Sequence, residues 1–392
     1  MEKTKVKNLA KQIRGVSYKP EDLHDSLDED SVILLRANNI DEGKVNFDDV
    51  VYVDKSKVSD EQYLKVGDVL ICASSGSKQL VGKAASVDFD SPCTFGAFCK
   101  VVRPNNNVAD YLGKYFQSGV YRRKISEVAI GANINNIRNE HIDSLELPIY
   151  EPAQAQRIVE KIGLLQNIID NRKCELSKLD ELIKARFVEL FGDPVQNEMG
   201  WRTEALEGIC NTIVDCPHST PSYTFDDTGF MCIRTSIVKK NKIIWEDIEY
   251  IPEEEYYQRI QRKKPEKGDV IYTREGAILG IAAIIDRDCN VALGQRSMLL
   301  SPNIDMCTPE FLSVAMNFDS FLNNALKGMS GSASPHINVG DIKAFQMILP
   351  PIVEQKHFSE VMNQIDKSKV AVQKALDEAQ LLFDSLMQEY FG

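Results

Sequence analysis

The sequence predicts an α+β fold in which two similar mixed α/β domains alternate with two long helices. Three observations support this prediction: a heptad pattern in the middle of the chain, a second one at its end, and a repetition of the whole plan after about 200 residues. The predicted segments are a first domain over residues 1–151, a long helix and linker over 152–195, a second domain over 196–351 and a second long helix over 352–392.

The first long helix is predicted from Gln154 to Gly192. Its apolar residues recur at alternating spacings of three and four, which is typical of the seam of a coiled coil. The seam consists of Ile158, Ile162, Leu165, Ile169, Leu176, Leu179, Ile183 and Leu190. Pro152 suits the start of such a helix, and Gly192 followed by Pro194 suits its end. Because the apolar stripe is narrow, we expect a partner helix to cover it.

The partner is predicted in the same chain, between Glu354 and Gly392. Its seam is less regular and consists of Phe358, Val361, Ile365, Val372, Ala375, Ala379, Leu382 and Leu386. Each helix alone is equally well explained as a core helix of a bundle. Both helices end on the same dipeptide, Phe191-Gly192 and Phe391-Gly392. This shared ending favours an internal repeat.

Six blocks in the same order extend the repeat through the domains. The matches are VILLRANNI with FMCIRTSIV, FDDVVYV with WEDIEYI, VGDVLI with KGDVIY, RPN with SPN, YLGKYFQS with FLSVAMNF, and GANINNIRNEHI with GSASPHINVGDI. Chance similarity of short apolar runs is the alternative, and the common order of the blocks argues against it. The copies differ most where loops are expected, as between residues 74–84 and 275–281.

Local patterns give the elements of the first copy. Residues 1–30 are expected to form a short helical or irregular lead-in. Strands are predicted within 31–53, 66–72 and 95–102, where β-branched and other apolar residues gather between turn residues. A one-sided apolar pattern predicts a helix over 110–120, and 131–136 is expected to form a polar loop. The second copy repeats this order.

Composition and charge limit the functional classes. A net charge of −12 counts against nucleic-acid binding by the whole surface, although it leaves room for a basic strip. The 9 cysteines lack C-x-x-C spacing, so we expect reduced thiols in the cytoplasm instead of zinc ligands or disulfides. The opening MEKTKVKNLAKQIRG lacks the apolar stretch of a signal peptide, and no run approaches the ~18 apolar residues of a membrane span.

The motifs of cofactor and metal enzymes are missing from the sequence. The nearest approach to a phosphate-binding loop, residues 76–84, has one residue too many between its glycines and Ala84 where a magnesium-binding hydroxyl is needed. We find neither G-x-G-x-x-G nor the Asn-Pro-Pro-Tyr with which amino-methyltransferases hold their target. The histidines show no metal or triad spacing, although His218 lies in the distinctive segment DCPHSTP.

Cationic and amide side chains gather in the predicted loops of both copies. Arginine and asparagine can each form two hydrogen bonds with a purine edge, and lysine and serine suit phosphates. A solvated face is the alternative for any single residue. The candidate DNA-binding residues are Lys78, Lys83, Arg103, Asn133, Asn135, Arg138, Arg274, Arg296, Lys327, Ser332, His336 and Asn338. The Gly67-Asp68 and Gly268-Asp269 turns are also expected to touch DNA, because small residues let the backbone approach.

This plan resembles the specificity subunits of prokaryotic Type I restriction–modification enzymes. The resemblance covers essentially the whole chain and depends on the repeat together with the junctions LPIYEPAQAQRIVEKI, MILPPIVEQKHFSEVM and FVELFGDPVQNEMGW. It implies that each domain is a target recognition domain for one half of a split DNA site. It also implies that the helices pair antiparallel and that the domains have pseudo-two-fold symmetry. Because the two domains differ in sequence, we expect the half-sites to differ.

The resemblance further implies partners. Modification subunits would dock on the helices and methylate adenine with S-adenosylmethionine, and restriction subunits would add ATP- and magnesium-dependent translocation and cleavage of double-stranded DNA. The specificity subunit itself would have no active site and no cofactor. The linker lacks the short tandem repeat that sets the site spacing in some members, so helix length alone is expected to set it.

Two other classes of function stay open at this point. An enzyme with two degenerate catalytic domains would need matched polar residues in one cleft, and a nuclease or methyltransferase assay on the isolated chain would detect it. A coiled-coil scaffold without a DNA function would explain the helices but not the basic loops, and salt-dependent DNA binding would exclude it.

Overall fold

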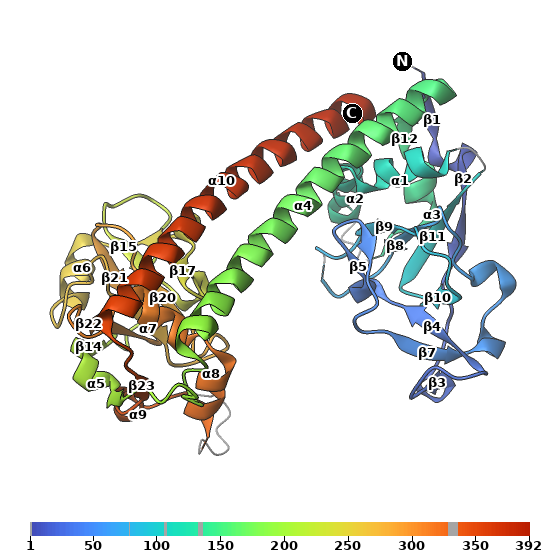
Figure 1. Ribbon diagram of the computed structural model, residues 1–392. Coiled ribbons are helices and arrows are strands. Elements are labelled where there is room, and N and C mark those ends of the chain that lie inside the picture. The colour runs from blue at the N-terminus through green and yellow to red at the C-terminus, as the bar shows by residue number, and fades with distance from the viewer. Residues whose placement is uncertain (1, 78, 106–107, 132–135, 328–335) are drawn as a thin grey trace. The chain divides into compact units, whose positions relative to one another are not determined.

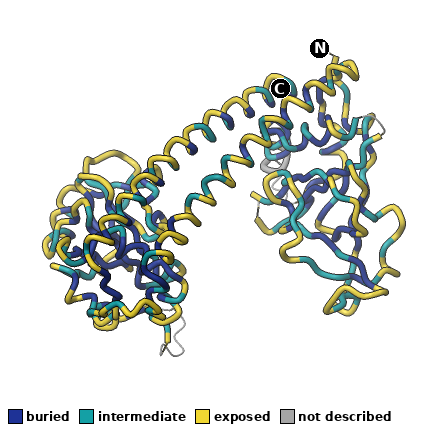
Figure 2. Tube along the Cα trace, viewed as in Figure 1, coloured by how far each residue is buried: buried dark blue, intermediate teal, exposed yellow. Residues whose placement is uncertain are grey.

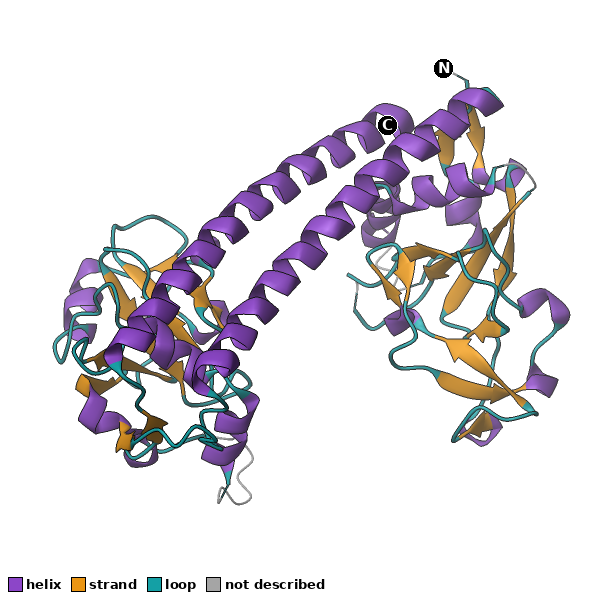
Figure 3. Ribbon diagram, viewed as in Figure 1, coloured by secondary structure: helices purple, strands orange, loops and turns teal. Residues whose placement is uncertain are grey.

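A computed structural model describes residues 2–77, 79–105, 108–131, 136–327 and 336–392 (Figure 1). The chain forms two compact units. Unit 1 holds residues 1–173 and 373–392, and unit 2 holds residues 174–372. Each unit combines helices with short sheets, which confirms the predicted α+β class (Figure 3).

Unit 1 begins with strands, in contrast to the helical or irregular lead-in expected for residues 1–30. Its strands are β1 (Lys3–Lys5), β2 (Ala10–Arg14), β3 (Leu23–His24), β4 (Ser31–Leu35), β5 (Ile40–Asp41), β6 (Lys44–Val45), β7 (Val51–Asp54), β8 (Val69–Cys72), β9 (Ala84–Ser86), β10 (Cys93–Phe95), β11 (Cys99–Pro104) and β12 (Glu146–Pro148). Its short helices are α1 (Ala109–Gln117), α2 (Gly119–Gly131) and α3 (Asn139–Asp143).

The strands within residues 1–30 were not predicted because they pair with strands that lie far away in the sequence. β2 pairs antiparallel with β11, matching Ile13 with Val101, and β1 pairs with β12 near the end of the domain. Only Ala10 and Ile13 of β2 are buried, so the strand carries a weak local pattern. The single strand predicted over 95–102 is also divided, because a turn at Gly96 separates β10 from β11.

Two four-stranded sheets form the body of unit 1. One has the strand order β2-β11-β8-β9 and is antiparallel throughout. The other has the order β10-β4-β7-β3 and contains one parallel pair, β4 with β10. The β5–β6 hairpin forms a separate two-stranded sheet.

Unit 2 repeats most of these elements in the same order. Its strands are β13 (Thr203–Ala205), β14 (Cys210–Asp215), β15 (Met231–Ile233), β16 (Val238–Lys239), β17 (Lys242–Ile243), β18 (Glu249–Tyr250), β19 (Val270–Thr273), β20 (Ala282–Ile284), β21 (Val291–Leu293), β22 (Ser297–Pro302) and β23 (Gln346–Ile348). Its short helices are α5 (Leu206–Ile209), α6 (Glu253–Arg259), α7 (Pro309–Met316), α8 (Asp319–Leu326) and α9 (Val339–Lys343).

The sheets of unit 2 match those of unit 1 except that β3 has no counterpart strand among the described residues, so the sheet β18-β15-β21 has three strands where β10-β4-β7-β3 has four. The order β14-β22-β19-β20 corresponds to β2-β11-β8-β9, and the parallel pair β15 with β21 corresponds to β4 with β10. The hairpin β16–β17 and the closing pair β13–β23 also have counterparts. The repeat inferred from short sequence blocks is thus a repeat of whole sheet topology.

The two long helices are α4 (Pro152–Phe191) and α10 (Ile352–Phe391), and each contributes one half to each unit. Buried positions recur along them among exposed ones (Figure 2). The predicted seam of α10 is wrong near its end, where Phe383 and Met387 are buried while Leu382 is 51% exposed. Among the described residues, no helix is both long and apolar enough to cross a membrane.

The last residue of each long helix closes the core of a unit. In unit 1, Phe391 is fully buried, with its ring 5.1 Å from Tyr111 and 5.8 Å from Tyr115. In unit 2, Phe191 is fully buried, with its ring 5.0 Å from Phe311 and 5.7 Å from Phe358. Each unit therefore needs a domain, the start of the helix that follows it and the end of the other long helix.

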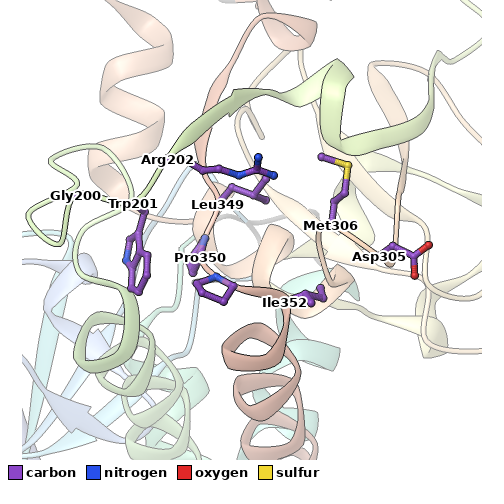
Figure 4. A pocket seen from close by; sticks show the side chains of 9 residues that line it. Gly200, Trp201, Arg202, Asp305, Met306, Leu349, Pro350 and Ile352 are labelled. Atoms are coloured by element: carbon purple, nitrogen blue, oxygen red, sulfur yellow. The ribbon is translucent and has the colours of Figure 1, made fainter.

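The linker after α4 returns the chain to the start of unit 2. Gly192 and Asn197 have φ of +75° and +50°, which produce the reversal. Trp201 then donates from Nε1 to the carbonyl of Phe191 at 3.1 Å. Trp201, Pro350 and Ile352 line a cavity of about 360 Å³ beside the start of α10 (Figure 4).

The terminal phenylalanines provide a test of this arrangement. Phe391→Ala should destabilise unit 1 by about 3–5 kcal/mol, because it leaves a cavity in a buried aromatic cluster. Both tryptophans, Trp201 and Trp245, belong to unit 2. For Phe391→Ala, hydrogen exchange in urea should show that unit 1 loses protection. The midpoint of the tryptophan fluorescence transition, which reports on unit 2, should shift less than in Phe191→Ala. Phe191→Ala should shift the fluorescence midpoint strongly.

The control is Leu382→Ala, which truncates a half-exposed side chain on the same helix as Phe391. It should cost less than about 1 kcal/mol. If Phe391→Ala is no more destabilising than this control, the end of α10 does not close unit 1.

Candidate nucleic-acid interface

In unit 1, three separate segments meet where β8 ends. They are the loop 73–83, the turn 96–98 before β11, and the segment 136–138. The carbonyl of Phe98 accepts from the backbone N–H groups of Ala73 and Ser74 at 2.9 and 3.0 Å. Ser74 forms a bridge with Asn136, and Ile137 donates to the carbonyl of Ala73 at 2.7 Å. Backbone hydrogen bonds therefore fix a three-part loop cluster, called loop cluster 1 below.

The long loop of cluster 1 is held from behind by a helix. Arg122 of α2 donates to the carbonyls of Val81 and Gln79 at 2.7 and 2.9 Å. The loop rejoins the sheet through Gly82, whose N–H donates to the carbonyl of Cys72 at 2.8 Å and whose φ is +82°. Arg122 therefore supports this loop from α2.

Loop cluster 1 presents one aromatic and several polar side chains to solvent. Phe98 is 71% exposed, which is unusual for a large apolar residue. Lys83 is partly exposed and lies 3.6 Å from Asp41, and Arg138 is exposed and lies 3.4 Å from Glu140. Asn136 is exposed as well. The cluster combines an apolar contact with cationic and amide donors.

Unit 2 builds the same cluster from matching segments, called loop cluster 2. The N–H of Arg274, which follows β19, donates to the carbonyl of Arg296 at 3.0 Å. Glu275 forms a bridge with His336, and Ile337 donates to the carbonyl of Arg274 at 2.8 Å. These contacts correspond to the bond from Ala73 to Phe98, the bridge of Ser74 with Asn136 and the bond from Ile137 to Ala73 in unit 1.

A buried ion pair lies beneath loop cluster 2. The Arg274 guanidinium donates from Nε and Nη2 to the two carboxylate oxygens of Asp215, at 2.9 and 3.2 Å. Both side chains are largely buried, so removing either would leave a charge without its partner in the protein. His218 lies on the solvent side of this pair, with Nε2 3.2 Å from Asp215.

Arg296 is the exposed cation of loop cluster 2. It adopts a φ of +68°, a conformation that costs energy for a side chain with a Cβ. The neighbouring Gly276 has a φ of +90°, and a Cβ on it would lie 3.3 Å from the Arg296 guanidinium. This glycine allows the loop to pass close to Arg296. In this arrangement Arg296 is exposed to solvent.

Two of the arginines predicted to bind DNA form ion pairs inside the protein. Arg103 pairs with the buried Asp68 at 2.7 and 2.8 Å, and it also donates to the carbonyl of Tyr63. Arg274 forms a similar ion pair with Asp215. In both cases the guanidinium hydrogen bonds are made inside the protein, so these side chains stabilise the fold.

The Gly67-Asp68 and Gly268-Asp269 turns, also predicted to contact DNA, hold their aspartates in buried ion pairs. Asp68 is 1% exposed and pairs with Arg103, and Asp269 is 6% exposed and lies 3.4 Å from Lys263. These turns precede β8 and β19, whereas the loop clusters follow them. The glycines serve tight turns at the opposite ends of the same strands.

The other candidates divide into three groups. Those within the loop clusters are Lys83, Arg138, Arg296, His336 and Asn338. Lys327 is exposed at the end of α8, the helix whose Leu322 packs against Gly280 of the loop. Lys78, Asn133, Asn135 and Ser332 lie outside the residues that the structure describes. Whether these residues contact DNA stays a prediction.

Sequence reasoning missed Phe98 because only charged and amide residues were considered. The segments FGAFC and LGQRS align at the offset already seen for the neighbouring RPN and SPN blocks. This alignment pairs Phe98 with Arg296, and the two residues make equivalent backbone contacts. His218 had a recognisable context, but its nearness to Asp215 depends on the fold.

The cysteines beside the clusters are not suited to nucleophilic chemistry. Burial raises the pKa of the Cys72 thiol next to cluster 1 and that of the Cys216 thiol next to cluster 2. Both thiols therefore stay protonated near neutral pH. Within the described residues, no group of three histidine, cysteine or acidic side chains gathers as a metal site.

Comparison with known proteins agrees with this architecture. A family model of the Type I restriction modification DNA specificity domain matches residues 198–379. The Type I restriction enzyme EcoKI specificity subunit of Escherichia coli strain K12 is 28% identical over 403 residues, covering 98% of this chain and 86% of that protein. The StySPI specificity subunit of Salmonella potsdam is 27% identical over 409 residues, again covering 98% and 86%.

A solved structure shares the fold. The S subunit of the Type-I restriction-modification system from M. genitalium superimposes with a TM-score of 0.54 at 14% identity, covering all of this chain and 96% of that one. The duplicated domain-and-helix fold, the family model and the full-length relatives agree with one another. Over nearly its whole length the chain is similar to specificity subunits of Type I restriction enzymes, and residues 198–379 match the DNA specificity domain of that family.

Proposed function

We propose that this chain reads a split, asymmetric DNA site, with unit 1 recognising one half and unit 2 the other. The observation that carries this proposal is the pair of loop clusters. They share equivalent backbone hydrogen bonds from Ala73 and Arg274 and from Ile137 and Ile337, but present different side chains, Phe98 in one and Arg296 in the other. A protein that recognises two different half-sites needs different side chains at equivalent positions of two similar backbones.

The chemistry of the two clusters suits base edges in the major groove. A guanidinium such as that of Arg296 can donate twice to guanine, and an exposed ring such as that of Phe98 can pack on the thymine methyl group. His336 and Asn136 add hydrogen-bonding groups beside them. The chain is therefore a recognition component, and catalysis belongs to other subunits.

The long helices suit the docking of those subunits. Half-exposed or more exposed apolar side chains remain on them in both units, which is expected of surfaces that another protein covers. In unit 1 these are Leu164, Ile168, Leu381 and Leu382, and in unit 2 they are Leu182, Val188, Val353 and Val370.

We infer that modification subunits occupy these surfaces and that restriction subunits join the same complex in the cytoplasm. S-adenosylmethionine, ATP and magnesium then act in those partners.

Exchange of one domain tests the proposed function. Residues 196–350 begin and end beside the β13–β23 pair, so a matching domain from a relative can be joined there. In cells with the intact modification system, this replacement should change one half of the methylated motif and leave the other half unchanged. Sequencing of DNA methylation measures both halves at once. A change in both halves would contradict separate recognition.

The helix surface can be tested in the same system. Leu164→Asp combined with Ile168→Asp places two carboxylates on an exposed apolar part of α4 and should weaken assembly with the modification subunits at least tenfold. The unfolding temperature of the isolated chain should change little, because both residues are already exposed. Size-exclusion chromatography with light scattering measures assembly.

The control introduces the same charge at neighbouring polar positions. Asn167→Asp combined with Asn171→Asp alters exposed residues of the same helix. Equal loss of assembly in both double variants would show that negative charge, and not the loss of an apolar surface, weakens the complex.

A further inference from the structure

The hairpin of β16 and β17 carries three lysines in four residues, with the sequence Lys239-Lys240-Asn241-Lys242. All three lysines are exposed. Lys239 and Lys242 are directly paired across the hairpin. Like charges in this position repel each other and destabilise a hairpin. Such an arrangement in a chain of net charge −12 calls for an explanation other than folding.

The tip of this hairpin is rigidly attached to the domain. Asn241 has a φ of +63°, and its N–H donates to the carbonyl of Ala282 at 2.9 Å. Its side-chain oxygen accepts from Ser313 at 2.9 Å and from Asn317 at 2.7 Å. The asparagine therefore fixes the turn, and the lysines on either side of it are held on a preorganised support.

Of the three hairpin lysines, Lys240 is paired with a carboxylate among the described residues. Lys240 lies 2.9 Å from Asp319, which is also 4.0 Å from Lys184 of α4. Within the described part of the chain, neither Lys239 nor Lys242 has a carboxylate within 4 Å. The hairpin, Lys184 and Phe318 border a cavity of about 350 Å³ that opens beside these lysines. Two ammonium groups are thus left available to an external anion.

The matching hairpin of unit 1 has the opposite character. Its cross-strand pair is Asp41 with Lys44, an attractive combination. Lys44 lies 2.6 Å from Asp170 of α4, and Glu42 lies 2.6 Å from Lys173 of the same helix. In unit 1 the charges of this hairpin are therefore used to attach it to a helix. The lysines of unit 2 are a departure from the repeat.

The basic hairpin adjoins loop cluster 2. β20, which follows the loop after Arg274, packs against both strands of the hairpin, and Asn241 bonds to its first residue, Ala282. A polyanion that extended from loop cluster 2 along β20 would therefore reach the hairpin.

We infer that Lys239 and Lys242 bind the phosphate backbone of the DNA whose bases are read by loop cluster 2. This inference rests on the proposed function. Ammonium groups hold phosphates without reading sequence, so the hairpin fixes the position of unit 2 on the duplex. The charge repulsion within the free hairpin is relieved when the phosphates arrive. Unit 1 lacks this contact at the equivalent position.

The test compares the salt dependence of binding. The full chain, assembled with its modification subunits, is titrated with a duplex carrying its methylated motif and with a scrambled duplex, between 50 and 200 mM salt. Each phosphate contact contributes about −0.9 to the slope of log K against log salt concentration. Lys239→Gln combined with Lys242→Gln should therefore reduce the magnitude of the slope by about 1.8. Affinity should fall by the same factor for both duplexes, and the methylated motif should stay the same.

A stability measurement separates this role from a structural one. Because the double variant removes a like-charge pair, the unfolding temperature of the isolated chain should rise or stay constant. The control, Lys44→Gln in unit 1, removes a lysine that is paired with Asp170 and should leave the salt slope unchanged.

Each other outcome overturns a definite claim. An unchanged slope in the lysine variant, with normal sequence preference in the wild-type complex, contradicts the phosphate contact and leaves the proposed function in place. Failure of the variant to assemble with modification subunits would show that the hairpin faces a protein instead. Absence of any sequence preference in the wild-type complex would contradict the proposed function itself.

Discussion

The burial of one phenylalanine at the end of each long helix is the contact on which both units depend. Phe391 completes the core of unit 1, and Phe191 completes that of unit 2. Neither residue belongs to the helix that directly follows the domain it stabilises. The two halves of the sequence therefore cannot be divided at 195 into two self-sufficient pieces. The duplication is visible in the sequence, but each stable unit includes the end of the long helix that belongs to the other copy.

This exchange leaves the loop clusters free to differ. The sheets and helix ends supply the stability of each unit, while the clusters need only their few backbone hydrogen bonds to keep their shape. Buried pairs such as Arg274 with Asp215 fix the base of a cluster without taking part in contact. Exposed positions such as 98 and 296 can then carry different side chains on the same backbone frame.

Sequence patterns gave the repeat, the fold class and the long helices, because these features rest on periodicity and collinear blocks. They failed where the partner is distant in sequence. The N-terminal strands depend on β11 and β12, and the helix seam near Leu382 depends on which face meets unit 1. Charge alone could not separate Arg103 and Arg274, which pair with buried aspartates, from the exposed Arg296. Phe98 was missed because it is uncharged and the DNA-binding candidates were chosen among polar and charged residues.

The central claim is that loop clusters 1 and 2 contact different halves of one DNA site. Photo-crosslinking tests it directly, with p-benzoylphenylalanine placed at Phe98, at Arg296 or, as a control, at Leu382 on α10. After assembly with modification subunits on a duplex carrying the methylated motif, the label at Phe98 should crosslink to one half-site and the label at Arg296 to the other. The label at Leu382 should give no DNA crosslink. Crosslinks from positions 98 and 296 to the same half-site, or to neither, would contradict the account.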